Sequence, residues 1–575
     1  MLRRIFSYMK EYKKYAWLAL ICIGVEVVLE IMVPKLMAEL IDIGVTNSDV
    51  PYIINKGIQM AVCAVAALIL GVGSARFSAL AGQGLGANIR KAEYEKLQSY
   101  SFSNIDHFSV SSLVTRLTSD VTNIQNAVST GMRPFGRSPV MLIFATTLAF
   151  RINSTLALVF LVALPILAVL LIIIIVNVGP RYGRMQGAVD LVNRCVQENL
   201  TAVRVVKSYV RGDYEIEKFG HVNGNLKNES EKAFGIAVLN MPAMQFVMYS
   251  TILGILLIGG RLINSGQMMI GQLTSFLSYV LLILNSLMMM SNVFLLMTRS
   301  LASAERIMKV IDEPIDITDE NAKDIEVKKG EIEFNHVWFK YKDTAKEYVL
   351  SDVSFHINAG QTVGIIGQTG SSKTTLIQLI PRLYDATKGE IKIDGINVKE
   401  YPVRHLRDAI SVVLQKNTLF SGSLIDNLRW GDENATLDEI KEACSIACVD
   451  EFIDRLPGGL DAEMGQEGVN VSGGQKQRIC IARAILKKPK VLILDDSTSA
   501  VDTATEGKIR NALAKKLPDM TKIIIAQRIS SVCHADQIII MDGGRVDAIG
   551  THESLLRTNK IYQEIYESQK EGADL

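Results

Sequence analysis

The sequence predicts a chain in two parts: an all-α membrane bundle of six helices with long cytoplasmic helical extensions, followed by an α/β domain. Three observations support this. The 575 residues are too many for one hydrophobic core. Apolar residues make up 49% of the chain and charged residues only 21%, a more apolar composition than is usual for a soluble protein. The apolar excess lies before about residue 300, and segments of ordinary polarity follow it.

Six apolar stretches in the first part are candidates for membrane spans, each of which needs about 20 residues. They cover roughly residues 15–34, 57–75, 138–150, 152–179, 242–260 and 268–297. The third is short between Arg137 and Arg151, and a tight external turn at "FRINST" is expected to join it to the fourth. Six is an even number, so both ends of the chain are expected on the same side of the membrane.

Basic residues predict the orientation of these spans. Lysines and arginines precede the first span and follow the second, namely Arg3, Arg4, Lys10, Lys13, Lys14, Arg90, Lys91, Lys96 and Arg116. The positive-inside rule places those segments in the cytoplasm. Two long connections, about residues 76–137 and 180–241, have helical periodicity and too many charges for lipid. We therefore expect helical extensions into the cytoplasm.

Two carboxylates and a methionine run interrupt the membrane part. Glu26 and Glu30 lie one helical turn apart in the first span, so they share a face that must avoid lipid. They either pair with residues of neighbouring helices, which we favour, or form a site for cationic cargo. The run Met288-Met289-Met290 either offers an adaptable surface to ligands or fills gaps in the core.

The second part begins after a linker at residues 313–329, so the expected domains are 1–312 and 330–575. Its segment "VGIIGQTGSSKTTLIQLI" is an apolar strand, a turn of small residues and a helix. This pattern is typical of a P-loop, in which backbone N–H groups and a lysine hold phosphates and a hydroxyl binds magnesium. Ser372 stands where the motif expects glycine. The predicted phosphate-binding residues are Gly367, Gln368, Thr369, Gly370, Ser371, Ser372, Lys373, Thr374 and Thr375.

Two further motifs support a nucleotide site. "VLILDD" is a buried strand that ends on Asp495, a candidate Mg²⁺ ligand, and Asp496. Between it and the P-loop lies "VSGGQKQR", whose hydroxyl and paired glycines at a helix start can hold a phosphate. The candidate residues there are Ser472, Gly473, Gly474 and Gln475.

With these motifs in order, the chain resembles ATP-binding cassette (ABC) exporter half-transporters, six membrane helices fused to one P-loop ABC ATPase domain, over essentially its whole length. The resemblance implies that Tyr341 stacks on adenine and that Gln415 senses the terminal phosphate and joins Thr374 and Asp495 at Mg²⁺. It also implies that "SAVD", which ends at Asp502, communicates across a dimer. ATP and Mg²⁺ are the expected ligands.

Two departures from the family pattern concern catalysis. Asp496 stands where the family has a glutamate base, and Gln527 replaces its switch histidine. Asp is one methylene shorter, and Gln cannot take up a proton. The site is therefore expected to bind ATP and hydrolyse it slowly. This pattern is most similar to the degenerate-site subunit of heterodimeric bacterial multidrug exporters. That similarity implies a partner half-transporter with the catalytic Glu and the switch His, whose site is completed by this chain's family signature, Ser472 to Gln475.

Alternative functions stay open at this stage. One is a homodimeric lipid or peptide exporter with weak ATPase activity based on Asp496, and another is an ATP-gated membrane regulator. The net charge of +1 argues against nucleic acid as a partner. The resemblance favours export of drug-like or amphipathic substrates across a bacterial plasma membrane, with both termini and the ATPase domain in the cytoplasm.

Overall fold

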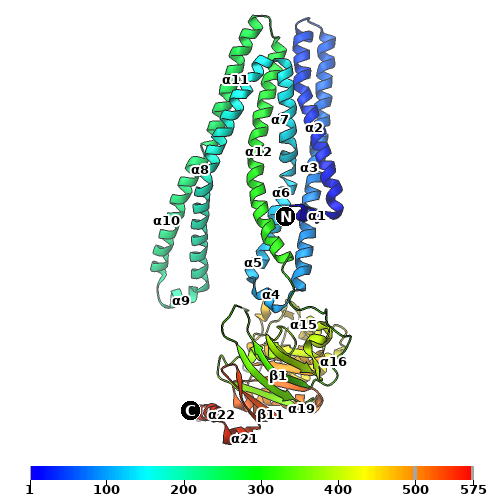
Figure 1. The fold of residues 1–575 in the computed structure, drawn as a ribbon, viewed down its shortest axis with the longest axis vertical. Helices are drawn as coiled ribbons and strands as arrows, with labels where there is room; N and C mark the ends of the chain where they lie inside the picture. The colour runs from blue at the N-terminus through cyan, green and yellow to red at the C-terminus, as the bar shows by residue number, and fades with distance from the viewer. Residues whose placement is uncertain (1, 343, 497–500, 572–575) are drawn as a thin grey trace. The chain divides into compact units, whose positions relative to one another are not determined.

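The computed structural model describes residues 2–342, 344–496 and 501–571 and divides into two compact units (Figure 1). The first unit comprises Met1–Leu97 and Ser111–Asp312, and the second comprises Gln98–Val110 and Glu313–Leu575. The short segment Gln98–Val110, which the sequence analysis included in the membrane part, therefore groups with the second unit. Its helix α4 (Phe102–Asp106) begins with a capping box between Ser101 and Asn104.

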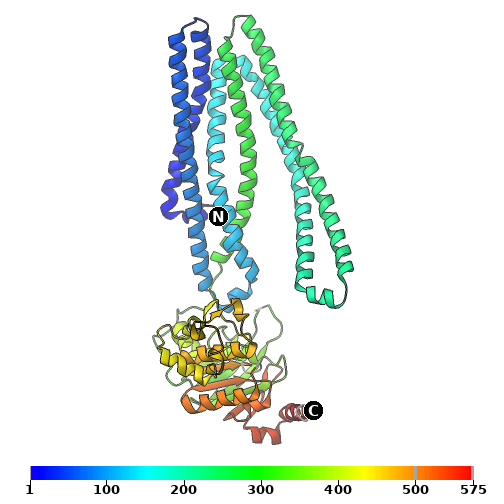
Figure 2. The ribbon, with the colours of Figure 1, turned by 180° about the vertical axis from the view of Figure 1, so that it is seen from behind.

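The first unit is entirely helical (Figures 1 and 2). Six long helices in its described residues carry the six predicted spans: α2 (Lys13–Glu39), α3 (Val50–Gln98), α7 (Met132–Ile152), α8 (Ser154–Thr201), α11 (Asn240–Asn264) and α12 (Ile270–Ile311). Within the described part of the chain, four helical stretches are long and apolar enough to cross a membrane, judged by length and composition: Lys10–Val45, Val50–Gln98, Gly212–Asn264 and Ile270–Met290. The other two predicted spans lie on α7 and α8.

The predicted connections are helical. The first contains α5 (Val110–Thr115), a π-helical turn at Arg116–Asp120 and α6 (Val121–Ser129), and the second contains α9 (Val203–Ser208) and α10 (Gly212–Ala237). Helices α8 and α10 lie side by side (Figures 1 and 2). The tight turn between α7 and α8 is confirmed, because Asn153 alone separates them and its side chain accepts a hydrogen bond from the Leu156 N–H at 3.0 Å.

Two helices extend beyond the predicted spans. Helix α7 begins at Met132, ahead of Arg137, and α2 continues past Pro34 to Glu39. Arg137 is tolerated inside the helix because its charge is paired with carboxylates of α2. Pro34 lies inside α2 and removes one of its backbone hydrogen bonds. The helix nevertheless continues, and it packs against α7 and α12.

The second unit is an α/β domain. Its main sheet has the strand order β12-β11-β3-β10-β9-β6, and β6, β9, β10, β3 and β11 run parallel. Their bounds are β3 (Thr362–Gly367), β6 (Ile410–Val413), β9 (Val491–Asp495), β10 (Thr521–Ile525), β11 (Gln537–Asp542) and β12 (Arg545–Gly550). A second sheet, with order β2-β1-β4-β5, contains β1 (Ile332–Phe339), β2 (Leu350–Ile357), β4 (Lys388–Ile393) and β5 (Ile396–Asn397).

Helices and a small two-stranded antiparallel sheet complete this unit. The small sheet pairs β7 (Gly422–Ser423) with β8 (Glu463–Met464). The helices are α13 (Lys373–Gln378), α14 (Val403–Asp408), α15 (Leu424–Arg429), α16 (Leu437–Ile446), α17 (Asp450–Ile453), α18 (Gly473–Leu486), α19 (Thr503–Lys516), α20 (Ile529–Val532), α21 (His552–Thr558) and α22 (Lys560–Glu571).

Register places the motif residues at one edge of the main sheet. Asp495 at the end of β9 lies opposite Ile525 at the end of β10, and Ile525 also pairs with Ile365 of β3. All three strands are parallel, so the loops that follow them leave the sheet at the same edge. This edge is where ligands bind in open α/β sheets.

Candidate functional site

The turn between β3 and α13 is tightly built. A side chain at Gly367 would place its Cβ 2.1 Å from the Met541 carbonyl oxygen, so only glycine fits. The Lys373 ammonium group donates to the Gly367 and Gln368 carbonyls at 2.8 and 2.9 Å and to Ser371 Oγ at 3.2 Å. Burial lowers the pKa of Lys373, and the carboxylates of Asp495 and Asp496 counteract part of that effect. The turn thus holds the Lys373 ammonium group against its own backbone carbonyls.

The backbone conformation at Ser372 explains why the P-loop motif expects glycine at this position. The residue precedes α13 with φ +70° and ψ +22°, in the left-handed region. This backbone conformation costs an L-residue about 1 kcal/mol that glycine does not lose. The loop therefore keeps the P-loop path despite the substitution, with local backbone strain.

Asp495 is the more buried of the two carboxylates, with 2% of its surface exposed. Thr374 Oγ1 donates to its Oδ1 at 3.2 Å, while its Oδ2 is buried without a hydrogen-bond partner among residues 2–342, 344–496 and 501–571. Burial raises the pKa of Asp495, and the negative charge of Asp496 adds to the increase. An unsatisfied carboxylate oxygen beside a threonine hydroxyl is the oxygen-rich donor set that Mg²⁺ requires.

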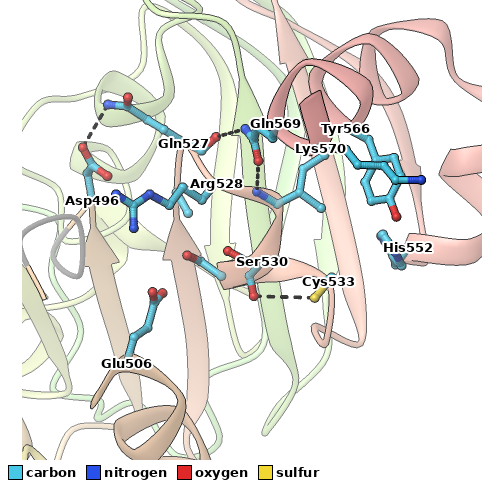
Figure 3. Close-up of a pocket in the computed structure, with 13 residues that line it drawn as sticks. Asp496, Glu506, Gln527, Arg528, Ser530, Cys533, His552, Tyr566, Gln569 and Lys570 are labelled. Atoms are coloured by element: carbon cyan, nitrogen blue, oxygen red, sulfur yellow. Dashed lines mark hydrogen bonds between the residues drawn. The ribbon is translucent and has the colours of Figure 1, made fainter. Parts of the chain in front are cut away.

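Asp496 and Gln527 contact each other directly. Gln527 Nε2 donates to Asp496 Oδ2 at 2.9 Å, and Figure 3 shows the two side chains pointing toward one another. Asp496 itself has φ +47°, again in the left-handed region. Burial raises its pKa, while hydrogen bonds from Gln415 and Gln527 oppose the rise. The structure therefore brings together Gln415, which the sequence analysis assigned to the terminal phosphate, with Asp496 at the base position and Gln527 at the switch position.

Tyr341 lies beside the P-loop helix. Its hydroxyl is 2.9 Å from Thr375 Oγ1, and 41% of the residue is exposed. Tyr384 packs edge-on against its ring with the centroids 5.2 Å apart, and the Tyr384 hydroxyl donates to Asp106 Oδ2 at 2.7 Å. No motif pointed to Tyr384, because an aromatic residue in an ordinary α/β domain carries no spacing signal of its own.

The signature residues begin helix α18. Ser472 is its N-cap and forms a capping box with Gln475, whose N–H donates to Ser472 Oγ at 3.3 Å. The Ser472 N–H donates to Gln475 Oε1 at 2.9 Å, and Ser472 and Gly473 are themselves exposed. Asp502 caps α19 by accepting from the Thr505 N–H at 2.9 Å. Ser499, which was assigned to the same loop as Asp502, lies outside the described residues.

The membrane carboxylates have cationic partners within their own unit. Arg137 binds Glu30 at 2.6 Å and Glu26 at 3.3 Å, and Arg133 binds Glu26 at 2.6 Å. Two glutamates of α2 thus face two arginines of α7. The favoured interpretation of the sequence, pairing with a neighbouring helix, is confirmed.

A cavity of about 310 Å³ lies between α8, α11 and α12 of the same unit. Methionine side chains and two amides line it, and its described lining has no charged side chain. Met288 contributes, while Met289 and Met290 are 40% and 47% exposed. The lining residues are Leu167, Met241, Met244, Gln245, Met248, Leu281, Leu284, Asn285 and Met288.

Both units match models of known protein families. Residues 16–287 match the ABC transporter transmembrane region, and residues 350–499 match the ABC transporter model. The chain is also similar to a solved structure of a bacterial Atm1-family ABC exporter with ATP bound, with a TM-score of 0.83, 22% identity, and coverage of 97% of this chain and 99% of the other. At that identity the similarity establishes the fold.

Curated relatives match over most or all of their length. The chain is 38% identical to the uncharacterized ABC transporter ATP-binding protein YfiB of Bacillus subtilis over 100% of both chains. It is 32% identical to the putative multidrug export ATP-binding/permease protein YgaD of the same organism, covering 84% of this chain and 83% of the relative. It is also 32% identical to an ATP-dependent lipid A-core flippase of Pseudomonas putida, covering 98% and 95%.

Proposed function

The chain belongs to the ABC transporter family, as a multi-pass half-transporter with its own ATPase domain, and we propose that it is the slow-site subunit of a heterodimeric exporter. Half-transporters of this family dimerise and use ATP to move a substrate. On this proposal the chain binds ATP at its own P-loop, hydrolyses it slowly, and lends Ser472–Gln475 to a faster site on a different subunit.

The contact between Gln527 and Asp496 supports a slow site. The amide of Gln527 donates to Asp496 Oδ2 at 2.9 Å and so occupies one of the two oxygens that a general base could offer to water. An amide can donate a hydrogen bond to a phosphate but cannot accept a proton. Asp496 is also shorter than glutamate by about 1.5 Å, whereas proton abstraction requires heavy atoms within about 3 Å or one bridging water.

The size of the effect follows from general acid–base catalysis. A well-placed base contributes about 10²- to 10⁴-fold to a rate, which is roughly 3 to 5 kcal/mol of barrier. ATP binding does not depend on that base, because the P-loop backbone and Lys373 hold the phosphates. The site therefore acts as a nucleotide clamp. Binding and hydrolysis are separated.

The metal position fits the same residues. Thr374, Asp495 and Gln415 would hold Mg²⁺, and the buried, unsatisfied Oδ2 of Asp495 is the observation that favours a cation there. When bound, Mg²⁺ neutralises charge on the outer phosphates. The chain's own contribution is to fix Thr374 Oγ1 against Asp495 Oδ1 and to exclude water from that carboxylate.

The cargo is proposed from the methionine-lined cavity. Flexible thioethers adapt to ligands of different shape, and the two amides supply hydrogen bonds without charge. Drug-like or amphipathic molecules of modest polarity suit such a lining, and the similarity to a putative multidrug export protein agrees with that choice. On this proposal both termini and the ATPase domain lie in the cytoplasm of a bacterial cell, and the basic first segment supports that orientation through the positive-inside rule.

A signature substitution tests the proposed division of labour. Ser472→Asp puts a negative charge where the partner's terminal phosphate would meet a helix N-terminus, which the helix dipole otherwise favours. We expect loss of about 100-fold or more of the ATPase activity of the assembled complex, since the competent site is disabled.

The control is the corresponding acidic substitution in the partner's signature, which touches only the slow site and is expected to be much milder. ATPase activity and substrate efflux are measured for both complexes at equal protein in the same membrane. Equal damage from the two substitutions would show two equivalent sites and contradict the proposal.

A further inference from the structure

The last helix of the chain, α22, is firmly attached to the ATPase domain. Its Tyr562 is fully buried in the hydrophobic core, and the Tyr562 hydroxyl is 2.7 Å from His552 Nδ1 on α21. Ile561 and Ile565 pack against the same core. The helix is therefore a fixed base from which its other side chains can act on neighbouring loops.

Gln569 of α22 binds the backbone of the loop that follows β10. Its Oε1 accepts from the Ile529 N–H at 2.8 Å, and its Nε2 donates to the Gln527 carbonyl at 2.7 Å (Figure 3). The two backbone groups flank Arg528. One side-chain amide thus uses a donor and an acceptor together to fix three consecutive residues.

The loop fixed in this way carries the switch glutamine. Gln527 contributes its carbonyl to Gln569 and its side-chain amide to Asp496 Oδ2, at 2.9 Å. Contacts therefore run without interruption from α22 through the backbone of residues 527–529 to the acidic residue beside the nucleotide site.

A cavity beside the 527–529 loop leaves the hydrogen bonds of Gln569 as a main restraint on that loop. About 890 Å³ of space lies next to the loop, lined by Asp496, Gln527, Arg528, Tyr566 and Gln569 among others (Figure 3). Close packing on that side of the loop is incomplete, so the paired hydrogen bonds of Gln569 provide restraint that packing would otherwise supply.

We propose that Gln569 is a positioning residue for this chain's own nucleotide site, one that latches the 527–529 loop and orders the Gln527 amide for its contact with the terminal phosphate. The inference rests on the proposed function in one respect, that ATP binds at this P-loop. Gln569 does not touch the nucleotide, and its effect passes through the loop.

Two glutamines on the same helix provide a matched test. Gln569→Ala removes both bonds to the loop, whereas Gln563→Ala removes a bond to the Leu556 carbonyl, at 2.6 Å, that lies away from it. The full-length chain is loaded with a fluorescent, non-hydrolysable ATP analogue and Mg²⁺, and the dissociation rate is measured by chase. We expect Gln569→Ala to release the analogue about 2- to 10-fold faster, the range that one net hydrogen bond supplies, and Gln563→Ala to match the unmodified chain.

Hydrogen exchange supplies a second readout that reports the latch itself. The Ile529 amide is expected to exchange faster in Gln569→Ala but to stay protected in Gln569→Glu, because a carboxylate still accepts from that N–H while it repels the Gln527 carbonyl. Analogue release in Gln569→Glu is expected to be faster than in the unmodified chain.

The inference is overturned if Gln569→Ala and Gln563→Ala release the analogue at the same rate, or if Ile529 exchange is unchanged in Gln569→Ala. Neither readout involves hydrolysis. A rapid ATPase rate in the unmodified chain would contradict the proposed function and leave the comparison of the two glutamines intact.

Discussion

The two carboxylate pairs of this chain differ in how their charges are balanced. In the membrane unit, Glu26 and Glu30 face Arg133 and Arg137, so two negative charges meet two positive ones. In the ATPase unit, Asp495 and Asp496 are adjacent in sequence and accept hydrogen bonds from neutral side chains, Asp495 from Thr374 and Asp496 from Gln415 and Gln527. Lys373 is near enough to affect their pKa values.

This difference is the one expected if the first pair is structural and the second, as proposed, binds a ligand. A charge that the protein balances internally holds helices together, and losing one partner leaves the other exposed to a low dielectric. A buried charge that the protein leaves partly unbalanced is unfavourable until a ligand arrives. Removal of one charge is therefore expected to destabilise the membrane unit and to stabilise the nucleotide-free ATPase unit.

The largest expected effect is in the membrane unit. Arg137→Ala leaves Glu30 without its ion-pair partner in the described part of the chain and Glu26 with only Arg133. Breaking a buried pair from one side typically costs about 3–5 kcal/mol. The measurement is thermal unfolding of the full chain in detergent. Arg151→Ala, at an exposed arginine of the same helix, is the control, and equal stability of the two variants would contradict the structural role.

The opposite sign is expected in the ATPase unit. Asp495→Asn removes a buried negative charge next to Asp496 and should stabilise the nucleotide-free protein, while Mg²⁺-dependent binding of ATP is lost. Thermal unfolding with and without Mg-ATP checks both effects, with the exposed Asp519→Asn as control. A lower unfolding temperature in the nucleotide-free Asn variant would show that Asp495 is a structural charge after all.

The difference in stability between the Asp495→Asn variant and the unmodified chain depends on pH, because the pKa of Asp495 is raised in the folded protein. An acid whose pKa is higher in the folded than in the unfolded state holds its proton more tightly when folded. Its destabilising contribution is absent below the ordinary pKa of about 3.9 and fully present above the raised one. The stability gain of Asp495→Asn should therefore grow as the pH rises through that window and then become constant.

The smallest expected effect is at the P-loop turn. Ser372→Gly relieves left-handed strain of about 1 kcal/mol, and the added flexibility of the unfolded chain cancels roughly half of the gain. Chemical denaturation should show stabilisation of about 0.5 kcal/mol. Ser371 is buried, and it is not among the residues with positive φ, so Ser371→Gly should destabilise instead. Stabilisation by both substitutions would point to a general preference for glycine and not to strain at Ser372.

The sequence alone predicted the features that depend on local pattern. Apolar stretches predicted the helices of the membrane unit, and the strand–turn–helix texture predicted β3, the loop before Lys373 and α13. The strand ending at Asp495 and the helix starting after Ser472 were predicted in the same way, because each begins or ends on a residue type that caps it or binds a ligand there.

Contacts between distant residues were harder to predict. The third span was predicted to begin after Arg137, because an unpaired arginine is unfavourable in lipid. The ion pair with Glu30 on the adjacent helix shows why Arg137 can lie within helix α7. Tyr384 and Gln569 belong to no sequence motif. Their contacts with Tyr341 and with the 527–529 loop could therefore be found only from the folded structure. Backbone strain at Ser372 and Asp496 likewise depends on the path of the chain.

The central claim, that this chain binds ATP but lacks an efficient base, is tested most directly by restoring the base and the switch residue. The purified full-length chain and its Asp496→Glu, Gln527→His double variant are loaded with Mg-ATP, and binding and hydrolysis are measured on the same samples. We expect similar ATP affinity, slow hydrolysis by the unmodified chain, and hydrolysis at least about tenfold faster in the double variant. Equal hydrolysis rates in the two proteins would contradict the account.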